Sequence, residues 1–304
     1  MVSIIIPLYN KEKQIATTIQ SVWRQTFQDY EIIIVNDGST DNSVKEIEAM
    51  RDTRIRLIHQ ENSGVSAARN RGISEAKYEL IAFLDADDEW KPQYLETQYE
   101  LYRKYPNCSV YASNYEFRDN ENHTHSTIIK KLLFDESNGI LTNYFEISSY
   151  SHPPLWTSAV MVRKEAIIKV GCFPLGVKSG EDLLVWARLA HHFEIAYNRK
   201  PLSVYQLVPD SLTDRPKRIP SSIDYVGIEL YKLFKEKPSH SLRLYNSHWH
   251  KMRCSIYMRL NLRKDALKEG MRALKFNLLN YKIYIYILLT LLPLKCRRRI
   301  LTLL

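Results

Sequence analysis

The sequence predicts an α/β protein in which the N-terminal third builds a parallel sheet covered by helices. Three apolar runs occupy residues 2–10, 30–35 and 78–84, the first two rich in Ile and Val, and segments of helical periodicity separate them. Strands that alternate with helices are typical of βαβ units, whose strands are parallel. Because the runs are apolar throughout rather than at every second position, we expect helices on both faces of the sheet.

The connecting elements follow the same pattern. Residues 11–25 predict a helix, because Ile15 and Ile19 recur at the spacing of one helical face. A second helix is expected at residues 42–50, and a short strand at residues 55–59. Right-handed crossovers, the default in such units, then bring the strands into one sheet.

Polar residues follow three of the predicted strands at the point where each strand ends. They occupy residues 9–10, 37–38 and 85–88. Ligands of open α/β sheets bind outside the carboxyl ends of the strands. We therefore expect these three loops to converge on one site.

The third loop is the most informative of them. Asp85, Asp87 and Asp88 place three carboxylates within four positions. Like charges packed this closely are unfavourable unless a cation lies among them. Carboxylates together with substrate phosphates are the usual ligands of Mg²⁺, and Mn²⁺ prefers the same oxygen donors. The loop predicts a metal-bridged diphosphate substrate, and the alternative is a solvated acidic turn after a strand.

Several short motifs resemble those of the family 2 glycosyltransferases. They are VSIIIPLYN (2–10), SVWRQTF (21–27), VNDGSTD (35–41), GVSAARNRG (64–72), DADD (85–88) and GEDLLVWAR (180–188). The match covers roughly residues 1–205 in the expected order, although any single motif is weak evidence. The resemblance implies a GT-A fold, which is a Rossmann-like mixed sheet flanked by helices. It also implies an inverting enzyme with a nucleotide-sugar donor and a divalent metal, Mn²⁺ or Mg²⁺.

The resemblance places the donor nucleotide against side chains of the first loops and the following helix. Pro7, Tyr9 and Asn10 are expected to hold the nucleoside, with the Tyr9 ring stacking on the base. Asp37 accepts from a uracil N–H when ionised, which favours a UDP-sugar. Arg69 approaches the donor near the diphosphate or the sugar, since a guanidinium suits phosphate oxygens. The structural alternatives are sheet-edge packing for Tyr9, a turn and helix cap for Asp37, and a surface position for Arg69.

The acidic motifs receive the remaining roles by the same resemblance. Asp87 is expected to be the most direct metal ligand, Asp85 to bind the ribose or the metal, and Asp88 to contact the donor sugar. Inverting transfer also needs a carboxylate that takes the proton of the acceptor hydroxyl. Asp182 is the predicted general base, and Glu181 bonds the donor sugar or orients a neighbour. The alternative is that both acids only stabilise the first turn of a helix.

Three further residues are predicted to contact the sugar or the acceptor. Trp156 and His152 precede a short apolar run, in a region that lies beside the donor sugar in the family. An aromatic plate on a sugar face is one interpretation of Trp156, and a buried core position is the other. Arg188 belongs to the acidic motif and is expected at the acceptor or paired with Glu181 or Asp182.

The charge distribution separates two regions of the chain. Residues 201–304 hold 20 Lys and Arg against 7 Asp and Glu, a net charge of +13, so the remainder carries −4 of the chain's +9. We expect a GT-A catalytic domain at residues 1–215 and a helical basic region at 216–304. Within the latter, helices are predicted at 225–237, 241–262 and 264–277.

The end of the chain combines an apolar segment at residues 283–294 with a basic one at 295–299. This apolar segment is shorter than the roughly 20 residues that span a bilayer. The combination predicts peripheral contact with an anionic membrane surface. The alternatives are a core helix with a solvated tail and a homodimer contact. Nucleic-acid binding is not expected, since no recognition motif accompanies the charge.

The compartment follows from two observations. The cysteines at positions 108, 172, 254 and 296 lie far apart, which predicts neither a zinc site nor a disulfide framework and indicates reduced thiols. The first strand starts at Val2 with no basic segment before it, so no signal peptide is expected. The predicted location is the cytoplasm, at the inner face of the cell membrane.

These features predict a hexosyl- or N-acetylhexosaminyltransferase. The acceptor would be a hydroxyl of a glycan or lipid-linked sugar, in the synthesis of bacterial surface polysaccharide. The alternative function is a donor-binding module without turnover that assists another transferase. Both bind nucleotide, but only the enzyme requires Asp182.

Overall fold

The computed structural model describes residues 1–207, 219–293 and 297. The chain divides into two compact units, Met1–Pro209 and Asp210–Leu304. The predicted domain boundary between residues 215 and 216 lies outside the described residues.

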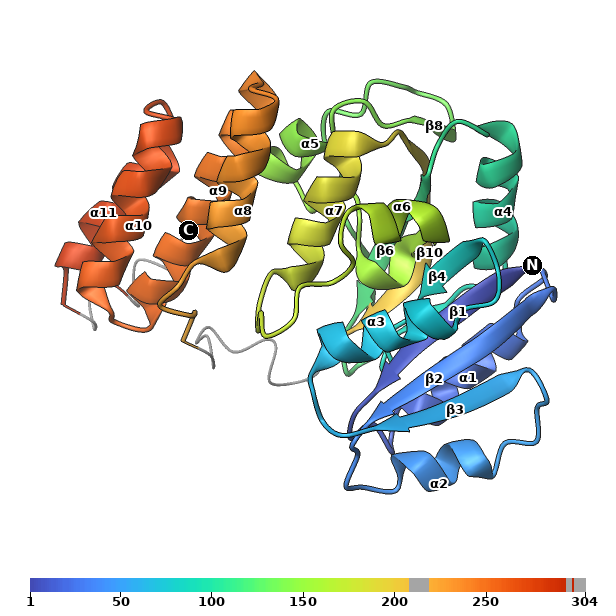
Figure 1. Ribbon diagram of the computed structural model, residues 1–304. Coiled ribbons are helices and arrows are strands. Elements are labelled where there is room, and N and C mark those ends of the chain that lie inside the picture. Colours follow the sequence, from blue (N-terminus) through green and yellow to red (C-terminus); the bar gives the residue numbers. More distant parts are fainter. Residues whose placement is uncertain (208–218, 294–296, 298–304) are drawn as a thin grey trace. The chain divides into compact units, whose positions relative to one another are not determined.

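One sheet forms the centre of the first unit (Figure 1). Among the described residues its ten strands are β1 (Val2–Leu8), β2 (Tyr30–Asp37), β3 (Ile55–Gln60), β4 (Leu80–Phe83), β5 (Glu89–Trp90), β6 (Val110–Arg118), β7 (Thr124–Ser126), β8 (Asn138–Ile140), β9 (Val160–Arg163) and β10 (Ile195–Gln206). The main order is β3-β2-β1-β4-β9-β6-β10-β5, with β7 beside β6 and β8 beside β10.

The sheet is mixed, as the resemblance implied. β1 pairs in parallel with both β2 and β4, and β2 pairs in parallel with β3. β9 is antiparallel to its two neighbours, β4 and β6. The four predicted N-terminal strands therefore form the parallel half of the sheet, and their carboxyl ends share one edge.

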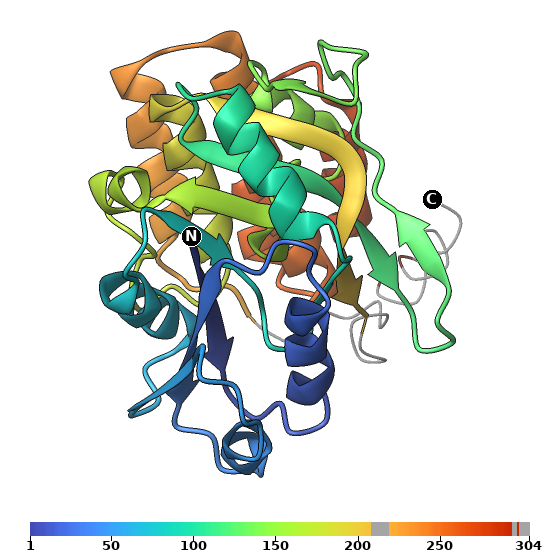
Figure 2. The ribbon, with the colours of Figure 1, turned by 90° about the vertical axis from the view of Figure 1, so that its right-hand side faces the viewer.

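Helices cover both faces of the sheet, which confirms the prediction made from the continuous apolar runs. The helices of this unit are α1 (Ile15–Trp23), α2 (Ser43–Glu48), α3 (Val65–Glu75), α4 (Tyr94–Lys104), α5 (Tyr144–Tyr150), α6 (Lys164–Lys169) and α7 (Glu181–His192), with a short 3₁₀ helix, η1 (Thr157–Ala159). Successive strand residues point to opposite faces. Ile4 therefore joins a core with residues of α1 and α4, while Ile5 joins one with residues of α3 and α7. In Figure 2, α4 (teal) lies in front of β10 (yellow).

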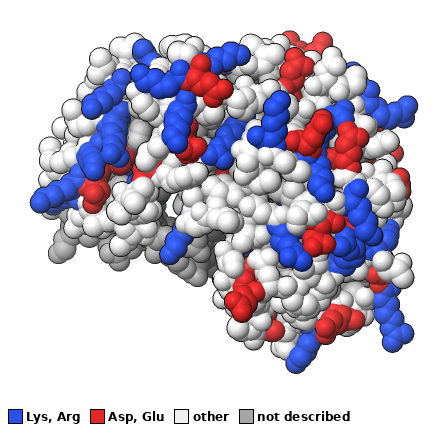
Figure 3. Space-filling view, in the orientation of Figure 1, with Lys and Arg blue, Asp and Glu red and all other residues white. Residues whose placement is uncertain are grey.

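The second unit is helical, as predicted from its periodicity. Its described helices are α8 (Tyr225–Glu236), α9 (His240–Arg259), α10 (Arg263–Phe276) and α11 (Tyr281–Leu291). Lys and Arg side chains gather over these helices, with fewer acidic ones among them (Figure 3). Within the described residues, no helix combines the length and the apolar character that crossing a membrane requires.

Arg297 does not fit the solvated tail that was one alternative for the basic segment. Its guanidinium is buried and donates to the carbonyl oxygens of Leu289 (2.9 Å) and Thr290 (3.0 Å) in α11, and of Met258 (2.5 Å) in α9. Carbonyls at helix ends lack partners inside the helix, so a cation stabilises them. The other residues of the predicted basic segment lie outside the described part of the chain.

Candidate active site

The loops after β1 and β2 meet at the expected edge of the sheet. Pro7 lies in β1 opposite Val35, and Tyr9 beyond the strand is 48% exposed, so its ring is available for stacking. Asn10 has a positive φ of 51° and its side-chain oxygen accepts from the Thr40 backbone at 2.8 Å. An Asn tolerates this left-handed conformation better than most residues. The Asn10 side chain thus fixes one loop to the other.

Asp37 at the end of β2 fixes the beginning of α3. The side chain is 3% exposed, and its oxygens accept from Gln60 Nε2 (2.7 Å), the Ser63 amide (2.9 Å) and the Gly64 amide (2.8 Å). Each carboxylate oxygen has room for about two donors, so Asp37 retains acceptor capacity for a base N–H. Asp37 therefore anchors the segment that leads into α3, whereas α2, the helix after residues 38–41, has Asn42 at its N-cap and no side-chain capping bond.

Helix α3 packs closely enough on β1 to hold Arg69 at the carboxyl edge of the sheet. A Cβ built on Gly72 would lie 2.3 Å from a methyl group of Ile5, so only glycine allows this approach. Arg69 is 4% exposed, and its Nη2 donates to Asp85 Oδ1 at 2.7 Å. Its Nη1 lies 3.6 Å from Glu181 Oε1. The structure therefore brings together three predicted site residues from distant segments.

The guanidinium of Arg69 keeps unused donors. Its Nε and Nη1 atoms are buried without a hydrogen-bond partner among the described residues, and the group lies 5.1 Å from the centre of the Phe173 ring. Burial opposes the charge, but Asp85 and the two acids of α7 outweigh it and raise the Arg69 pKa. A buried guanidinium with free N–H groups is suited to bind phosphate oxygens.

The acidic loop after β4 presents two carboxylates to solvent. The side chains of Asp85 and Asp87 are 26% and 22% exposed. Lys11 Nζ donates to Asp87 Oδ2 at 2.5 Å, which links the first loop to the third. The three polar loops therefore converge as predicted. No role of Lys11 was predicted from the sequence, although Lys11 directly follows Asn10, which is a predicted site residue.

Asp88 differs from the other two acids because it is fully buried. Its Oδ2 accepts from Ser158 Oγ at 2.5 Å, and the Gln206 amide lies 3.4 Å from Oδ1. Burial raises the Asp88 pKa well above the ordinary value, and the charges of Asp85 and Asp87 add to this. The carboxyl group of Asp88 therefore supports the loop, and its predicted contact with a sugar stays a prediction.

Glu181 and Asp182 occupy the first turn of α7, after Gly180 in a left-handed conformation with φ of 79°. Burial raises the pKa of Asp182 above its ordinary value, and the Arg69 charge offsets part of this effect. Burial and the neighbouring Asp182 raise the Glu181 pKa. A raised pKa improves a carboxylate as a proton acceptor near neutral pH. The helix-dipole interpretation and the catalytic one are both compatible with this position.

Aromatic rings connect Trp156 and His152. Trp156 is half-buried, stacks on Tyr115 at 5.4 Å between ring centres and meets Tyr205 edge-on at 5.0 Å. Phe117 meets Tyr205 at 5.7 Å and His152 at 5.7 Å. His152 is exposed, and its Nδ1 accepts from a backbone amide at 3.1 Å. Trp156 is therefore a half-buried aromatic side chain, rather than a fully buried core residue.

Arg188 lies on α7 with Nη1 3.4 Å from the Val170 carbonyl, beside the turn that precedes the acidic motif. Asn70 fixes the same segment to α3, through paired side-chain hydrogen bonds with the Phe173 backbone at 2.8 and 2.9 Å. Asn70 has no predicted role in the sequence, although it belongs to the motif that contains Arg69. These contacts hold α3 and the loop before α7 together, so that Arg69 faces Glu181.

Metal binding by Asp85 and Asp87 stays a prediction. Each has a partly exposed carboxylate, and two carboxylates with substrate phosphates are a typical Mg²⁺ site. Within the second unit, ligand atoms of Asp224, His250 and Glu269 also lie within 4.8 Å of one another. There, however, Arg253 Nε lies 3.4 Å and 3.6 Å from the two carboxylates and supplies the positive charge.

Comparison with known families identifies the class of protein. The family model for Glycosyl transferase family 2 matches residues 3–171. The glycosyltransferase GlyA of Streptococcus pneumoniae is 30% identical over 219 residues, 70% of this chain and 31% of that protein. The chain therefore belongs to glycosyl transferase family 2.

Other relatives align over shorter stretches. GlyG of Streptococcus pneumoniae is 42% identical over 118 residues, 38% of this chain and 39% of GlyG. EpsH of Bacillus subtilis, a putative glycosyltransferase, is 48% identical over 97 residues, 31% of this chain and 28% of EpsH. The chain thus spans well under half the length of the curated relatives that it matches.

Solved structures of similar fold come from TarS of S. aureus. TarS 1-349 in complex with UDP-GlcNAc superimposes with a TM-score of 0.62 at 16% identity, covering 98% of this chain and 91% of that one. The complex with UDP gives a TM-score of 0.59 at 18% identity, with the same coverage. At this identity the likeness supports the GT-A fold.

Proposed function

We propose that this protein transfers a hexose or an N-acetylhexosamine from a UDP-sugar to a hydroxyl of a glycan or lipid-linked acceptor, with inversion at the anomeric carbon. The observation that carries the proposal is the buried Arg69, which bridges Asp85 and Glu181 and keeps two donor groups unused. An anionic donor group beside it would satisfy those donors. The UDP and UDP-GlcNAc bound in the TarS structures make a uridine nucleotide the first donor to test.

The donor would bind along the carboxyl edge of the sheet. Pro7, Tyr9 and Asn10 would hold the nucleoside, with the exposed Tyr9 ring on the base, and Asp37 would accept from the base. Arg69 would bind the diphosphate. A divalent cation held by Asp85 and Asp87 would act as a Lewis acid and neutralise charge on the departing diphosphate. Lys11 would then leave Asp87 Oδ2, with which it is paired in this structure.

The acceptor would enter from the side of α7. Asp182 would take the proton of the acceptor hydroxyl while that oxygen attacks the anomeric carbon opposite the leaving diphosphate. Glu181, held near Arg69, would bond the donor sugar. Trp156 offers a ring face to a sugar, and His152 and Arg188 are further candidates for acceptor contacts. Asp88, buried against Ser158, would position the acidic loop.

The Asp182→Asn variant tests this assignment. UDP release from a panel of UDP-sugars with Mn²⁺ should fall by about two orders of magnitude or more, in line with the loss of a general base. UDP affinity should not change. Asp135→Asn, which alters an exposed aspartate elsewhere in the first unit, is the matched control. Full activity of Asp182→Asn would contradict the proposed base, and nucleotide binding without turnover of any UDP-sugar would favour the donor-binding module.

A membrane surface is the proposed location, because lipid-linked acceptors of surface polysaccharide synthesis lie there. Apolar side chains at helical spacing are exposed along α11: Tyr281 (66%), Tyr284 (44%), Leu288 (63%) and Leu291 (57%). Such a stripe beside basic residues is typical of helices that lie in the membrane interface. The protein should co-sediment with vesicles that contain anionic lipid, and the Leu288→Glu substitution should reduce the fraction that co-sediments. A homodimer that dissociates in Leu288→Glu would instead assign this stripe to a subunit contact.

A further inference from the structure

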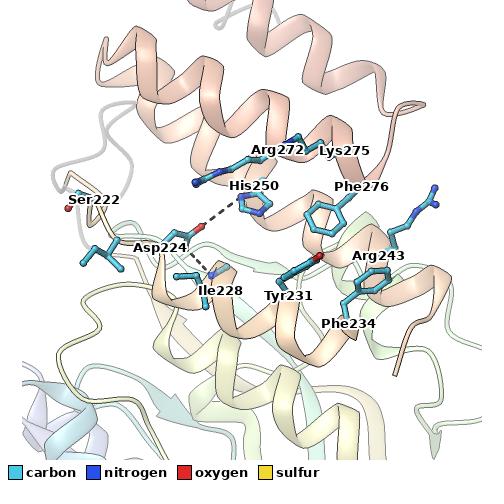
Figure 4. Close-up of a pocket in the computed structure, with 12 residues that line it drawn as sticks. Ser222, Asp224, Ile228, Tyr231, Phe234, Arg243, His250, Arg272, Lys275 and Phe276 are labelled. Atoms are coloured by element: carbon cyan, nitrogen blue, oxygen red, sulfur yellow. Dashed lines mark hydrogen bonds and ion pairs between the residues drawn. The ribbon is translucent and has the colours of Figure 1, made fainter. Parts of the chain in front are cut away.

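The second unit contains a cavity of about 690 Å³ among α8, α9 and α10 (Figure 4). Sites for small molecules usually measure roughly 300–1,000 Å³ and combine apolar walls with a few polar groups. All residues that line the cavity belong to the second unit. None of them has a role in the site of the first unit.

Aromatic side chains form one wall of the cavity. Tyr231 and Phe234 of α8 and Phe276 of α10 pack against one another, with ring centres 6.0–6.3 Å apart. Tyr231 is 43% exposed, and the two Phe rings are half-buried. The wall therefore offers ring surface to a ligand, whereas a core cluster would be sealed.

Buried polar groups form the floor. Asp224 and His250 line the cavity and are each 7% exposed. Asp224 Oδ1 accepts from the Gly227 amide (3.0 Å) and from Trp249 Nε1 (3.1 Å). His250 Nδ1 lies 2.7 Å from Glu269 Oε2, and its Nε2 has no hydrogen-bond partner among the described residues. An imidazole that is fixed at one nitrogen and free at the other can bond a ligand.

Cationic side chains stand at the opening without matching acids. Arg243 and Lys275 line the cavity and are exposed, and neither has a carboxylate partner within the part of the chain that the structure describes. A third cation, Arg272, is paired with Glu269 at 2.8 Å. Asp224 of the floor and the neighbouring Glu269 are already balanced by Arg253 and Arg272. The cavity therefore favours a negatively charged ligand.

We propose that this cavity binds an anionic saccharide, namely a phosphate- or carboxylate-bearing segment of the glycan acceptor. The C–H face of a sugar ring packs on aromatic rings, its hydroxyl groups exchange hydrogen bonds with His250, and its anionic group pairs with Arg243 and Lys275. The identity of this ligand as acceptor rests on the proposed function. The site would hold a part of the acceptor chain other than its reacting end, so its loss weakens acceptor binding and leaves the donor site intact.

Binding of glucose 6-phosphate, glucose and inorganic phosphate to the full chain tests the proposal, with UDP and Mn²⁺ present to fill the donor site. We expect glucose 6-phosphate to bind more tightly than either glucose or phosphate, since it engages both the rings and the cations. The double variant Arg243→Gln/Lys275→Gln should weaken it about tenfold, as should Tyr231→Ala. Lys282→Gln, an exposed lysine of α11 that does not line the cavity, is the matched control.

Three results would overturn the proposal. The first is that glucose 6-phosphate does not bind at a concentration of about 10 mM, since a dissociation constant above this value is too weak for a specific site. The second is equal binding by Arg243→Gln/Lys275→Gln and by Lys282→Gln. The third is a protein that binds anionic vesicles but no sugar phosphate, and that loses vesicle binding in both Arg243→Gln/Lys275→Gln and Tyr231→Ala. This result would assign the cavity to lipid. None of these three results contradicts the proposed function, provided that Asp182→Asn still loses sugar transfer while its UDP affinity is unchanged.

Discussion

Each unit of this family 2 protein buries an arginine between two acids, and the two clusters differ in how far those acids are exposed. Arg69 of the first unit faces Asp85 and Glu181, and Asp85 remains 26% exposed. Arg253 of the second unit faces Asp224 and Glu269, which are 7% and 4% exposed. The same residue types are therefore partly exposed in one unit and buried in the other.

The partners of the acids explain the difference. Asp224 is bonded to the Gly227 amide and Trp249, and Glu269 to His250 and Arg272. Arg253 Nη2 also donates to Tyr257 Oη at 3.0 Å. The cluster of the second unit is thus a structural one, in which removal of one charge leaves another buried and unpaired. The cluster of the first unit retains partly exposed carboxylates, as a ligand site requires. Two donors of Arg69, Nε and Nη1, have no hydrogen-bond partner there, against one of Arg253, Nε.

The largest expected effect is on the structural cluster. Arg253→Met should destabilise the second unit by about 3–5 kcal/mol, because it leaves Asp224 and Glu269 with an uncompensated buried charge. Thermal unfolding followed by circular dichroism measures this. Arg259→Met, at the exposed end of the same helix, should change the midpoint little. An equal midpoint for both variants would show that Arg253 is not structural.

Arg69→Met should act on the donor instead. Losing a charged donor to the diphosphate should weaken UDP binding about 10- to 100-fold, measured by calorimetry. Arg69→Lys should rescue only part of the affinity, since an ammonium lacks the planar fork of a guanidinium. Unchanged UDP affinity in Arg69→Met would remove the main argument for the donor site.

Lys11→Met should have a smaller effect of the opposite sign. The Lys11 ammonium pairs with Asp87 where a divalent cation is expected, and a partly exposed pair is worth about 0.2–1 kcal/mol. Mn²⁺ affinity, measured by electron paramagnetic resonance, should therefore rise about two- to fivefold. Asp87→Asn should lower it. Weaker Mn²⁺ binding in Lys11→Met would indicate that Lys11 supports the metal site rather than competing for it.

The smallest expected effect is that of low pH, which should reduce activity through Asp182 before it reduces stability through Glu269. Burial raises the pKa of Asp182, so the proposed base is protonated, and activity falls, at a higher pH than an ordinary aspartate would give. Burial alone would raise the pKa of Glu269, but the His250 hydrogen bond and charge and the charges of Arg253 and Arg272 outweigh it and lower the pKa. The stability from Glu269 is therefore present above its unfolded pKa and is lost only as the pH falls through the lower folded value.

A pH series of activity and of circular dichroism tests this order. Activity should decline while the helical signal of the protein is unchanged. A simultaneous loss of both would mean that unfolding, and not protonation of Asp182, controls the acid limb of activity.

Much of the first unit could be predicted because its signals are local. Continuous Ile and Val runs place β1, β2 and β4, and acids directly after β4 mark the ligand edge of the sheet. The antiparallel pairing of β9 has no such local signal, since it depends on which strands become neighbours after folding. The mixed sheet was expected only because the motifs resemble those of the family.

Exposure of individual acids could not be predicted from the sequence. Asp87 and Asp88 are adjacent, yet Asp87 is partly exposed and Asp88 is buried against Ser158 and Gln206, which come from distant segments. The contact between Arg69 and Glu181 likewise depends on packing between α3 and α7. The cluster around Arg253 has no sequence signal, because its members are spread over several elements and each alone resembles a surface residue.

A crystal structure with UDP and Mn²⁺ tests the central claim most directly. We expect the diphosphate within hydrogen-bonding distance of Arg69, the metal bound by Asp85 and Asp87, and the Lys11 ammonium displaced from Asp87. Density for nucleotide and metal away from these three side chains would contradict the account.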